Sequence, residues 1–358
     1  MKPFQIFLPS LLALALVLGS CKKEIETQIQ IKEVEKQASW TEVTSLYGLA
    51  RVIMSTGTDG QAIYLQQPNA FTRFLGSQSL VTAAGPLPSD VNVRVPFGRD
   101  FFAYPDTDTS LVLCRNREPL NSRFYFNLRR FDPAALRFDT KFFSLSKCMA
   151  INQNNFLLAP YVNKRPDRAF TFVLAAVQPG ALGSGPVMAY MGPVVIPRPA
   201  FSGAYLRYLV AIDNYFLASF GDGGIYKIKQ DGSFRQVYGA ATVDAIYKWN
   251  NTLYGPIEYG EIITSTDAGE TWQKSSGTPQ QFTLASYYPV KDSLVCVYSN
   301  SLYSLRWNGP RYSLRPLKND GLERATITGV EYLRDTVYVA TTSGLFARPV
   351  KAFFEAKQ

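Results

Sequence analysis

Short apolar strands and polar turns alternate through most of the chain, and this pattern predicts an all-β fold. Seven times, an apolar strand is followed by a polar turn and a second apolar strand, as in "YLVAIDNYFLAS" from Tyr208 and "GVEYLRDTVYVA" from Gly329. Asp and Asn suit such turns because their side chains bond the local backbone and they tolerate left-handed conformations. A loop and a third strand follow each copy, and a fourth strand such as "GSFRQVYG" follows several of them.

The spacing of these copies indicates a repeating unit of four strands. Successive turn residues are separated by 37 to 59 residues, which suits a propeller blade with some loop insertions. The turn residues used for this alignment are Asp100, Asn155, Asn214, Asn251, Asp292 and Asp335. We therefore predict a seven-bladed β-propeller over residues 39–358, with six or eight blades, or an irregular β-sandwich, as alternatives.

The two ends of the array are predicted to meet. The first copy is assigned to "LYGLARVIMS" from Leu46, with "QAIYLQQ" as its third strand, and the last copy lacks an obvious fourth strand. Because "SWTEVTS" from Ser39 resembles the fourth strands, Trp40 to Thr44 is predicted to complete blade seven and close the ring. Such closure removes exposed sheet edges.

Aromatic residues make up 14% of the 358 residues, with 24 Phe and 21 Tyr, an enrichment typical of strands. Length alone allows one or two domains. Three inserted segments, 75–92, 131–147 and 178–207, are candidates for shaping a pocket, although long loops are also tolerated without a function.

Residues 1–20 are predicted to be an export signal. Lys2 precedes an apolar run from Phe4 to Leu18, which is too short to span a membrane. The following "LGSC" resembles the lipobox of bacterial lipoproteins, and "SCKKE" resembles the start of Bacteroidota surface lipoproteins. The resemblance implies cleavage before Cys21, lipidation of Cys21 and anchoring to the periplasmic or surface face of the outer membrane. Residues 21–38 then form a polar tether, and a cleaved signal with an unmodified cysteine is the alternative.

The stretch "STDAGETW" is the most specific motif in the chain. It fits S-x-D-x-G-x-T-W and resembles the Asp-box, or BNR repeat, of sialidases, sortilin-type receptors and Ycf48-like propellers. The matching residues are Ser265, Asp267, Gly269, Thr271 and Trp272. In such a turn, Asp and Ser bond backbone amides, Gly takes a positive φ and Trp packs between sheets. The resemblance implies a structural turn on the face opposite the ligand-binding mouth.

The loops between second and third strands are predicted to meet at one face, the mouth. Tyr104, Tyr161 and Tyr259 accompany several carboxylates in these loops. The acidic residues placed at the mouth are Asp59, Asp106, Asp108, Asp222, Glu258 and Glu261. One interpretation is a site for a cation, a basic peptide or sugar hydroxyls, with tyrosine rings as stacking platforms. The other is that Asp and Gly are what tight turns require.

The amino-acid composition excludes several kinds of catalytic and metal-binding site. The chain has no histidine, which excludes Ser-His-Asp triads and most zinc sites. With Cys21 lipidated, Cys114, Cys148 and Cys296 allow at most one disulfide, and no CxxC spacing occurs. We predict no cofactor and no metal. The net charge of +9, or +8 once Lys2 is removed, is scattered along the chain, so nucleic acid is not a predicted partner.

The predicted function is binding or scaffolding without catalysis, in a lipid-anchored monomer of the cell envelope whose partner is a glycan or a protein. A sialidase-like glycoside hydrolase is one alternative, because Arg94 in "VRVP" resembles the Arg-x-Pro motif on an early inner strand of sialidases. A Ycf48-like assembly factor for a membrane complex is the other alternative that the Asp-box resemblance implies.

Overall fold

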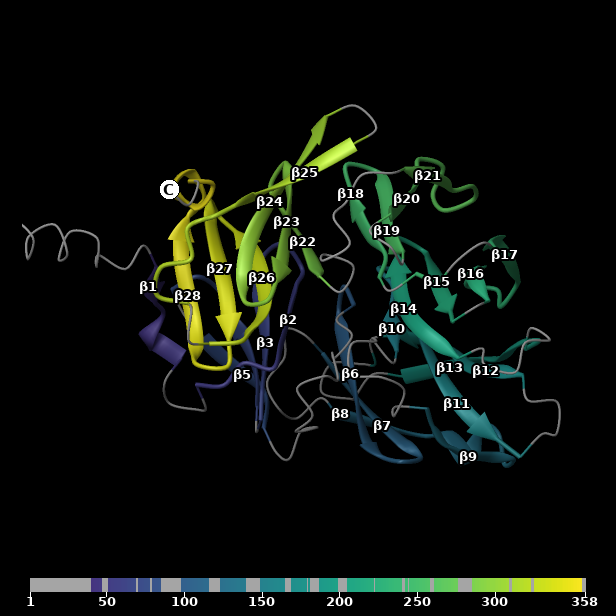
Figure 1. The fold of residues 1–358 in the computed structure, drawn as a ribbon. Coiled ribbons are helices and arrows are strands. Elements are labelled where there is room, and N and C mark those ends of the chain that lie inside the picture. Colours follow the sequence, from purple (N-terminus) through teal and green to yellow (C-terminus); the bar gives the residue numbers. More distant parts are fainter. Residues whose placement is uncertain are drawn as a thin grey trace, which may run out of the picture.

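The strands form seven antiparallel sheets that follow one another along the chain as the blades of a propeller (Figure 1). The structure is a computed structural model. It describes residues 40–46, 51–68, 70–77, 79–84, 98–115, 123–139, 149–164, 169–178, 180, 187–198, 205–221, 223–239, 242–243, 245–257, 261–275, 285–308, 311–322 and 325–355. The predicted all-β, seven-bladed fold is confirmed.

The first three blades come from the N-terminal half of the chain. Blade one contains β2 (Ser55–Thr58), β3 (Ile63–Gln67), β4 (Ala70–Phe74) and β5 (Ser79–Ala84). Blade two contains β6 (Phe101–Thr107), β7 (Ser110–Arg115) and β8 (Arg123–Asn127), followed by the 3-10 turn η2 (Leu128–Arg130). Blade three contains β10 (Ala150–Ile151), β11 (Phe156–Asn163), β12 (Phe170–Gln178) and β13 (Val187–Ile196), and β9 (Ala135–Phe138) pairs with the end of β11.

The last four blades follow the predicted strand order. Blade four contains β14 (Leu206–Ile212), β15 (Tyr215–Phe220), β16 (Gly224–Ile228) and β17 (Phe234–Tyr238). Blade five contains β18 (Tyr247–Trp249), β19 (Thr252–Ile257), β20 (Glu261–Ser265) and β21 (Gln273–Ser275). Blade six contains β22 (Ser286–Val290), β23 (Ser293–Tyr298), β24 (Ser301–Asn308) and β25 (Arg311–Pro316). Blade seven contains β26 (Ile327–Leu333), β27 (Thr336–Thr341), β28 (Gly344–Pro349) and β1 (Thr41–Glu42).

Blade one differs from the sequence prediction by one strand. The segment "IYLQQ" is β3, the second strand, whereas the prediction made it the third. The true first strand, β2, begins at Ser55, and its turn to β3 is the "DG" of Asp59 and Gly60. The earlier apolar segment from Leu46 attracted the prediction, but residues 51–54 are not in a strand.

The ring is closed by the N-terminal strand, as predicted. β1 pairs with β28 through Thr41 opposite Ala347, and the Val43 amide donates to the Leu345 carbonyl at 2.8 Å. Trp40 is only 4% exposed, and its indole meets the ring of Phe353 edge-on at 5.8 Å. Phe353 belongs to the short terminal helix α2 (Val350–Phe353), while the 3-10 turn η1 (Thr44–Leu46) follows β1. Both ends of the described chain therefore pack on blade seven (Figure 1).

Apolar side chains are buried in seven clusters, and each cluster lies between two neighbouring blades. Phe71 of blade one meets Phe102 of blade two at 4.4 Å, and Leu46 and Ile53 pack with Tyr338 between blades one and seven. The clusters thus run round the whole ring. Every blade buries both of its faces against neighbours, which is why a single closed domain forms.

Cys114 and Cys296 are buried in different clusters, the first between blades one and two and the second between blades five and six. Burial raises the pKa of Cys296 to about 12, so this thiol is protonated and unreactive at neutral pH. Cys148 lies outside the described residues. Within the part of the chain that the structure describes, no helix is long and apolar enough to cross a membrane.

We expect Trp40→Ala to lower the free energy of unfolding by about 3 to 5 kcal/mol, because a buried indole leaves a cavity at the ring closure. Tyr125→Ala is the matched control, since Tyr125 is 57% exposed on β8. Its effect should stay within about 0.5 kcal/mol. Urea unfolding of both variants measures the difference, and equal losses would show that the N-terminal strand does not stabilise the ring.

Candidate functional site

The ring has two faces, and the direction of the first strands defines them. Thr56 of β2 donates to Glu331 of β26 at 2.7 Å, and Thr328 donates to the Ile53 carbonyl at 2.8 Å. In each pair the two residues are 275 positions apart in the sequence. The first strands of blades one and seven, β2 and β26, therefore run parallel to each other. Because blades have four antiparallel strands, turns between first and second strands share one face with turns between third and fourth strands. We call it the turn face, and the opposite face the mouth face.

Neighbouring blades touch through their first turns, which gathers these turns at the turn face. The Asn155 amide of blade three donates to Asp100 of blade two at 2.9 Å. The backbone amide of Gln153 donates to the backbone carbonyl of Asp213 in blade four at 3.1 Å. The carboxylate of Asp213 pairs with Lys248 of blade five at 2.5 Å. Asp and Asn in these turns therefore have structural partners.

Asp59 belongs to the turn face, not to the predicted mouth. It lies between β2 and β3, the first and second strands, so it shares a face with Asp335, which lies between β26 and β27. Its carboxylate accepts the amides of Gln61 and Ala62 at 2.9 and 2.8 Å and the hydroxyl of Tyr64 at 2.9 Å. This correction follows from the strand shift in blade one.

β6 runs from the turn face, where Asp100 contacts Asn155, to the mouth face, so Asp106 and Asp108 at its connection to β7 lie at the mouth face. Both are exposed. Asp106 accepts a local hydrogen bond from the Ser110 hydroxyl at 3.2 Å, and the Asp108 carbonyl accepts the Phe138 amide at 2.6 Å. Asp108 thus connects blade two to β9 of blade three.

The two described mouth tyrosines are interior residues. Tyr104 and Tyr161 are each 4% exposed. Tyr104 packs on Phe71 at 5.6 Å, and the Tyr161 hydroxyl donates to the buried Asp132 at 2.7 Å. Their rings are therefore walls of the fold, not open platforms.

Cys21, Arg94, Asp222, Glu258 and Tyr259 lie outside the described residues. Glu261 begins β20, the third strand of blade five, so it lies at the mouth face, and it pairs with Lys274 at 2.5 Å. No group of three or more metal-binding side chains occurs in the described part of the chain.

A cavity of about 380 Å³ lies at the mouth face between blades three and four. The end of β11 and the start of β12 line it, together with Arg198 after β13 and Tyr205 before β14. The lining residues that carry polar groups or open ring surface are Asp139, Tyr161, Asn163, Phe170, Arg198 and Tyr205. This volume is near the lower end of small-molecule sites, which span about 300 to 1,000 Å³.

Asp139 is the electrostatic centre of the cavity. Its amide donates to the Pro160 carbonyl at 2.9 Å, which fixes it beside β11. Its Oδ1 atom is buried and has no hydrogen-bond partner among the described residues. Burial raises the pKa of the Asp139 carboxyl, and the positive charge of Arg137 opposes this shift. An unpaired buried acceptor is costly to the fold.

Neighbouring residues pack against Arg198 and against the aromatic rings of this cavity. The Arg198 guanidinium carbon lies 5.4 Å from the centre of the Phe170 ring, and Phe170 packs on Phe220 at 4.3 Å. The Tyr205 ring lies against Gly221, where a side chain would collide with it. The Tyr205 hydroxyl accepts from Arg207 at 3.1 Å. The Arg198 side chain is exposed.

A second cavity, of about 330 Å³, lies where the first strands meet. Thr56, Tyr208, Tyr247, Lys248 and Glu331 contribute to its lining. Its charged groups already have partners within the fold, since Glu331 accepts from Thr56 and Lys248 pairs with Asp213. It is a weaker candidate for a site than the cavity around Asp139.

The "STDAGETW" segment forms a compact turn between β20 and β21, on the turn face. Asp267 accepts the Thr271 amide and hydroxyl at 2.9 and 2.6 Å, and Ser265 accepts the Gly269 amide at 2.9 Å. Gly269 has a φ of +80°, which favours glycine. Trp272 is partly buried against the cluster between blades four and five.

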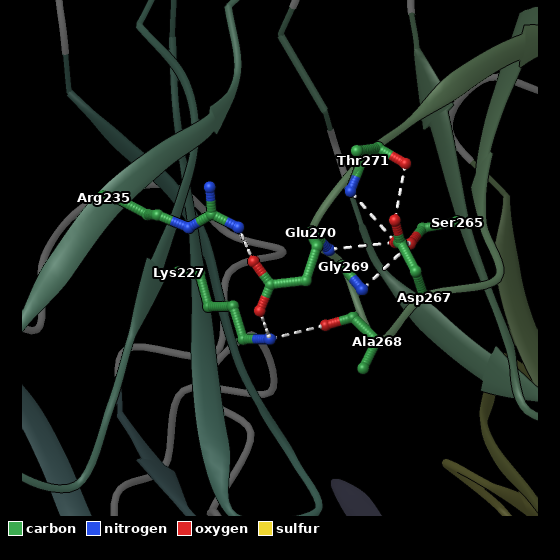
Figure 2. A network of polar contacts seen from close by, with 8 residues as sticks. All are labelled: Lys227, Arg235, Ser265, Asp267, Ala268, Gly269, Glu270 and Thr271. Atoms are coloured by element: carbon green, nitrogen blue, oxygen red, sulfur yellow. Dashed lines mark hydrogen bonds and ion pairs between the residues drawn. The ribbon is translucent and has the colours of Figure 1, made fainter.

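Figure 2 shows how this turn joins blade four. Lys227 of β16 donates to Glu270 at 2.5 Å and to the Ala268 carbonyl at 2.9 Å, and Arg235 of β17 also pairs with Glu270. The Lys227 side chain is 8% exposed, and burial lowers its pKa. The ammonium group also lies 4.0 Å from the centre of the Tyr215 ring. These contacts give the turn a role in joining blades.

The inserted segments could be recognised in the sequence, but the residues in them that line the cavity could not. Asp139 comes from segment 131–147, and Arg198 and Tyr205 come from segment 178–207. Much of the latter is not a loop, because Val187–Ile196 forms β13. No local pattern marks Asp139, since its position depends on the pairing of β9 with β11.

Comparison with protein-family models finds no match, and no curated protein matches the sequence. Among solved structures, the chain is similar to a catalytically inactive virginiamycin B lyase from Staphylococcus aureus with quinupristin, at a TM-score of 0.54 and 12% identity over 86% of this chain and 97% of that chain. It is also similar to U3-55K, at a TM-score of 0.52 and 11% identity over 86% and 98%.

A structure of YCF48 bound to a D1 peptide aligns over 87% of this chain and 96% of that chain, at a TM-score of 0.48 and 9% identity. A TM-score at this level supports no functional argument. The identities of all three structures are so low that the likeness shows the propeller fold alone.

We expect Glu270→Ala to lower the free energy of unfolding by about 2 kcal/mol, because it leaves the buried Lys227 ammonium without its carboxylate. Glu261→Ala is the matched control, since Glu261 and Lys274 form a more exposed pair. Its effect should be below about 1 kcal/mol. Urea unfolding distinguishes the two variants, and similar effects would contradict a joining role for the turn.

The stability of the turn should depend on pH. Hydrogen bonds from Thr271 and Ser265 lower the pKa of Asp267 to about 2. Because the folded pKa lies below the unfolded value of about 4, the stabilisation is present above about pH 4 and is lost as the pH falls toward 2. The stability difference between wild type and Asp267→Asn should shrink over that range in thermal unfolding. In Thr271→Val, carboxyl NMR titration should show a higher Asp267 pKa; an unchanged value would contradict this account.

Proposed function

We propose that this protein is a non-catalytic binding or scaffolding module of the bacterial cell envelope, which holds a glycan or a protein at its mouth face. The observation that carries the proposal is the cavity between blades three and four. It combines aromatic walls, the exposed side chain of Arg198 and the partly buried carboxyl group of Asp139. A concave, partly aromatic site with a few fixed polar groups is typical of ligand binding.

The proposal includes a lipid anchor at Cys21 and a monomeric state. It rests on the apolar N-terminal run, the "LGSC" sequence and the polar segment 21–38. Trp40 begins the ring closure, and the chain from Cys21 to Trp40 spans 40 − 21 = 19 residues. Fully extended, such a tether reaches on the order of 60 Å, so the mouth face can meet partners well away from the membrane.

The cavity supports binding more than hydrolysis. Glycosidases need two carboxyl groups about 5 to 9 Å apart. Asp139 is the one carboxylate among the described residues that line the cavity. The sialidase alternative depends on Arg94, and no described residue bears on it.

The test is an array of glycans and peptides probed with the full chain in detergent, beside a fluorogenic sialoside assay. Asp108→Arg changes an exposed charge on the mouth face and should weaken the binding of a positively charged peptide several-fold, because rim charges steer association. Asp231→Arg makes the same change in the turn between β16 and β17, on the turn face, and should leave binding unchanged. Sialoside turnover that is abolished by Arg94→Ala would overturn the proposal, as would binding that responds only to Asp231→Arg.

A further inference from the structure

We propose that the outer edge of β13 in blade three binds an extended, uncharged segment of a partner protein, which joins the blade as an additional strand. This inference goes beyond the proposed function, because the edge lies on the outer rim of the ring and not at the cavity of the mouth face. Two observations carry it: the edge lacks the charged residues that protect other outermost strands, and apolar side chains along it are exposed.

β13 is the outermost described strand of its blade. The sheet has the order β10, β11, β12 and β13, and no strand of the described chain pairs with the far side of β13. At 10 residues, Val187–Ile196 is also the longest described strand. The edge of a sheet presents a row of backbone N–H and C=O groups, and an extended peptide segment satisfies such a row by pairing with it.

The first observation is the absence of charge. The sequence of β13, "VMAYMGPVVI", contains no charged residue. Most other outermost strands carry at least one, namely Glu42 in β1, Arg123 in β8, Arg235 in β17, Lys274 in β21 and Arg311 in β25. β5 also lacks a charge, but it has only 6 residues. Charged side chains on edge strands oppose pairing with other chains, so β13 is the longest edge without this protection.

A bulge divides β13 into two halves. The register with β12 shifts between Tyr190 and Gly192, which leaves Met191 as the extra residue, and Pro193 follows. Bulges and prolines interrupt pairing at an edge. The residues from Val187 to Met191 precede this interruption, so they form the part of the edge that can accept a strand.

The second observation is the exposed apolar surface of this first half. Blade four covers the second half, because Val194 and Ile196 are buried in the cluster between blades three and four. In the first half, Val187 is 55% exposed and Met191 is 54% exposed, and Ala189 between them is also exposed. Apolar side chains of an added strand would cover these residues, and such cross-strand pairs stabilise a sheet.

The other side of the same half is held in place by packing. Met188 and Tyr190 lie against the cluster between blades two and three, and the centres of the Tyr190 and Phe131 rings are 5.0 Å apart. The edge is therefore already formed before a partner arrives, which lowers the entropic cost of binding. The edge has no charged side chain with which to pair a charge, so a matching segment is uncharged and has apolar residues at alternate positions.

The experiment uses the full chain in detergent and the peptide KTVTVTVTK with a fluorescent label. Its lysines keep it soluble, and they are repelled by a protein with a net charge of +9, so attraction between charges does not drive binding. The control peptide has the same side chains but an N-methyl group on every valine and threonine. It measures binding to detergent or to apolar surface, because it cannot donate to a strand edge. Fluorescence anisotropy gives the affinity, and hydrogen exchange locates the protected backbone amides.

The test variant combines Val187→Lys with Met191→Lys. Its matched control combines Tyr125→Lys on β8 with Phe234→Lys on β17, whose side chains are 57% and 37% exposed. Both variants add two positive charges in place of exposed apolar residues. Because all four positions are exposed, both variants should keep the fold.

We expect the peptide to bind, with an affinity at least about tenfold lower in the test variant and within about twofold in the control. Hydrogen exchange should slow at Val187–Met191. The proposal is overturned if the peptide does not bind, if the N-methylated peptide binds equally well, or if the test variant keeps its affinity. Sedimentation that shows a dimer in the wild type and a monomer in the test variant would assign the edge to a second copy of this chain and would also overturn it.

This result is separate from the test of the mouth face. Binding that responds to Asp108→Arg and not to the β13 substitutions would leave the proposed function standing without support for the edge. Peptide binding that responds only to the β13 substitutions would establish the edge independently of the mouth face.

Discussion

The structure depends on one constraint: each sheet is apolar on both faces, and only a neighbouring blade can cover either face. The seven apolar clusters are all shared between adjacent blades, so no blade has a core of its own. A row of sheets always leaves two faces uncovered, and a ring leaves none. This explains why Trp40 and Phe353, from opposite ends of the described chain, are packed against each other.

The same constraint explains the polar features of the turns. Around the turn face, Asp100, Asp213 and Glu270 bind groups on the next or the preceding blade. The STDAGETW segment therefore joins blades four and five. Side chains that bind a neighbouring blade are not available to a ligand. The cavity between blades three and four lies at the mouth face instead.

The sequence was sufficient for the parts of the fold that depend on local patterns. Hairpins such as that of Asn250 and Asn251, both with positive φ, could be predicted because the turn residues and flanking strands are adjacent in sequence. The strand assignment predicted for blade one was wrong by one strand, because an apolar segment that is not a strand precedes β2. The cavity could be predicted only as inserted segments, since Asp139 and Arg198 come to line one cavity through the tertiary arrangement of β9, β11 and β13. The periodic pattern of apolar and polar residues does not show which distant residues will line the same cavity.

The closing strand β1 has only two residues in its ladder, opposite Phe346 and Ala347. Under the proposed anchoring at Cys21, the tether enters the fold at this strand, so any pull between the membrane and a bound partner acts first on the ring closure. The indole of Trp40 and the bond from Val43 to Leu345 lie on either side of the ladder and share that load. With such an anchor, the ring closure would be the mechanical link between the membrane and a partner held at the mouth face, and its resistance to force would limit the pull that the attachment withstands.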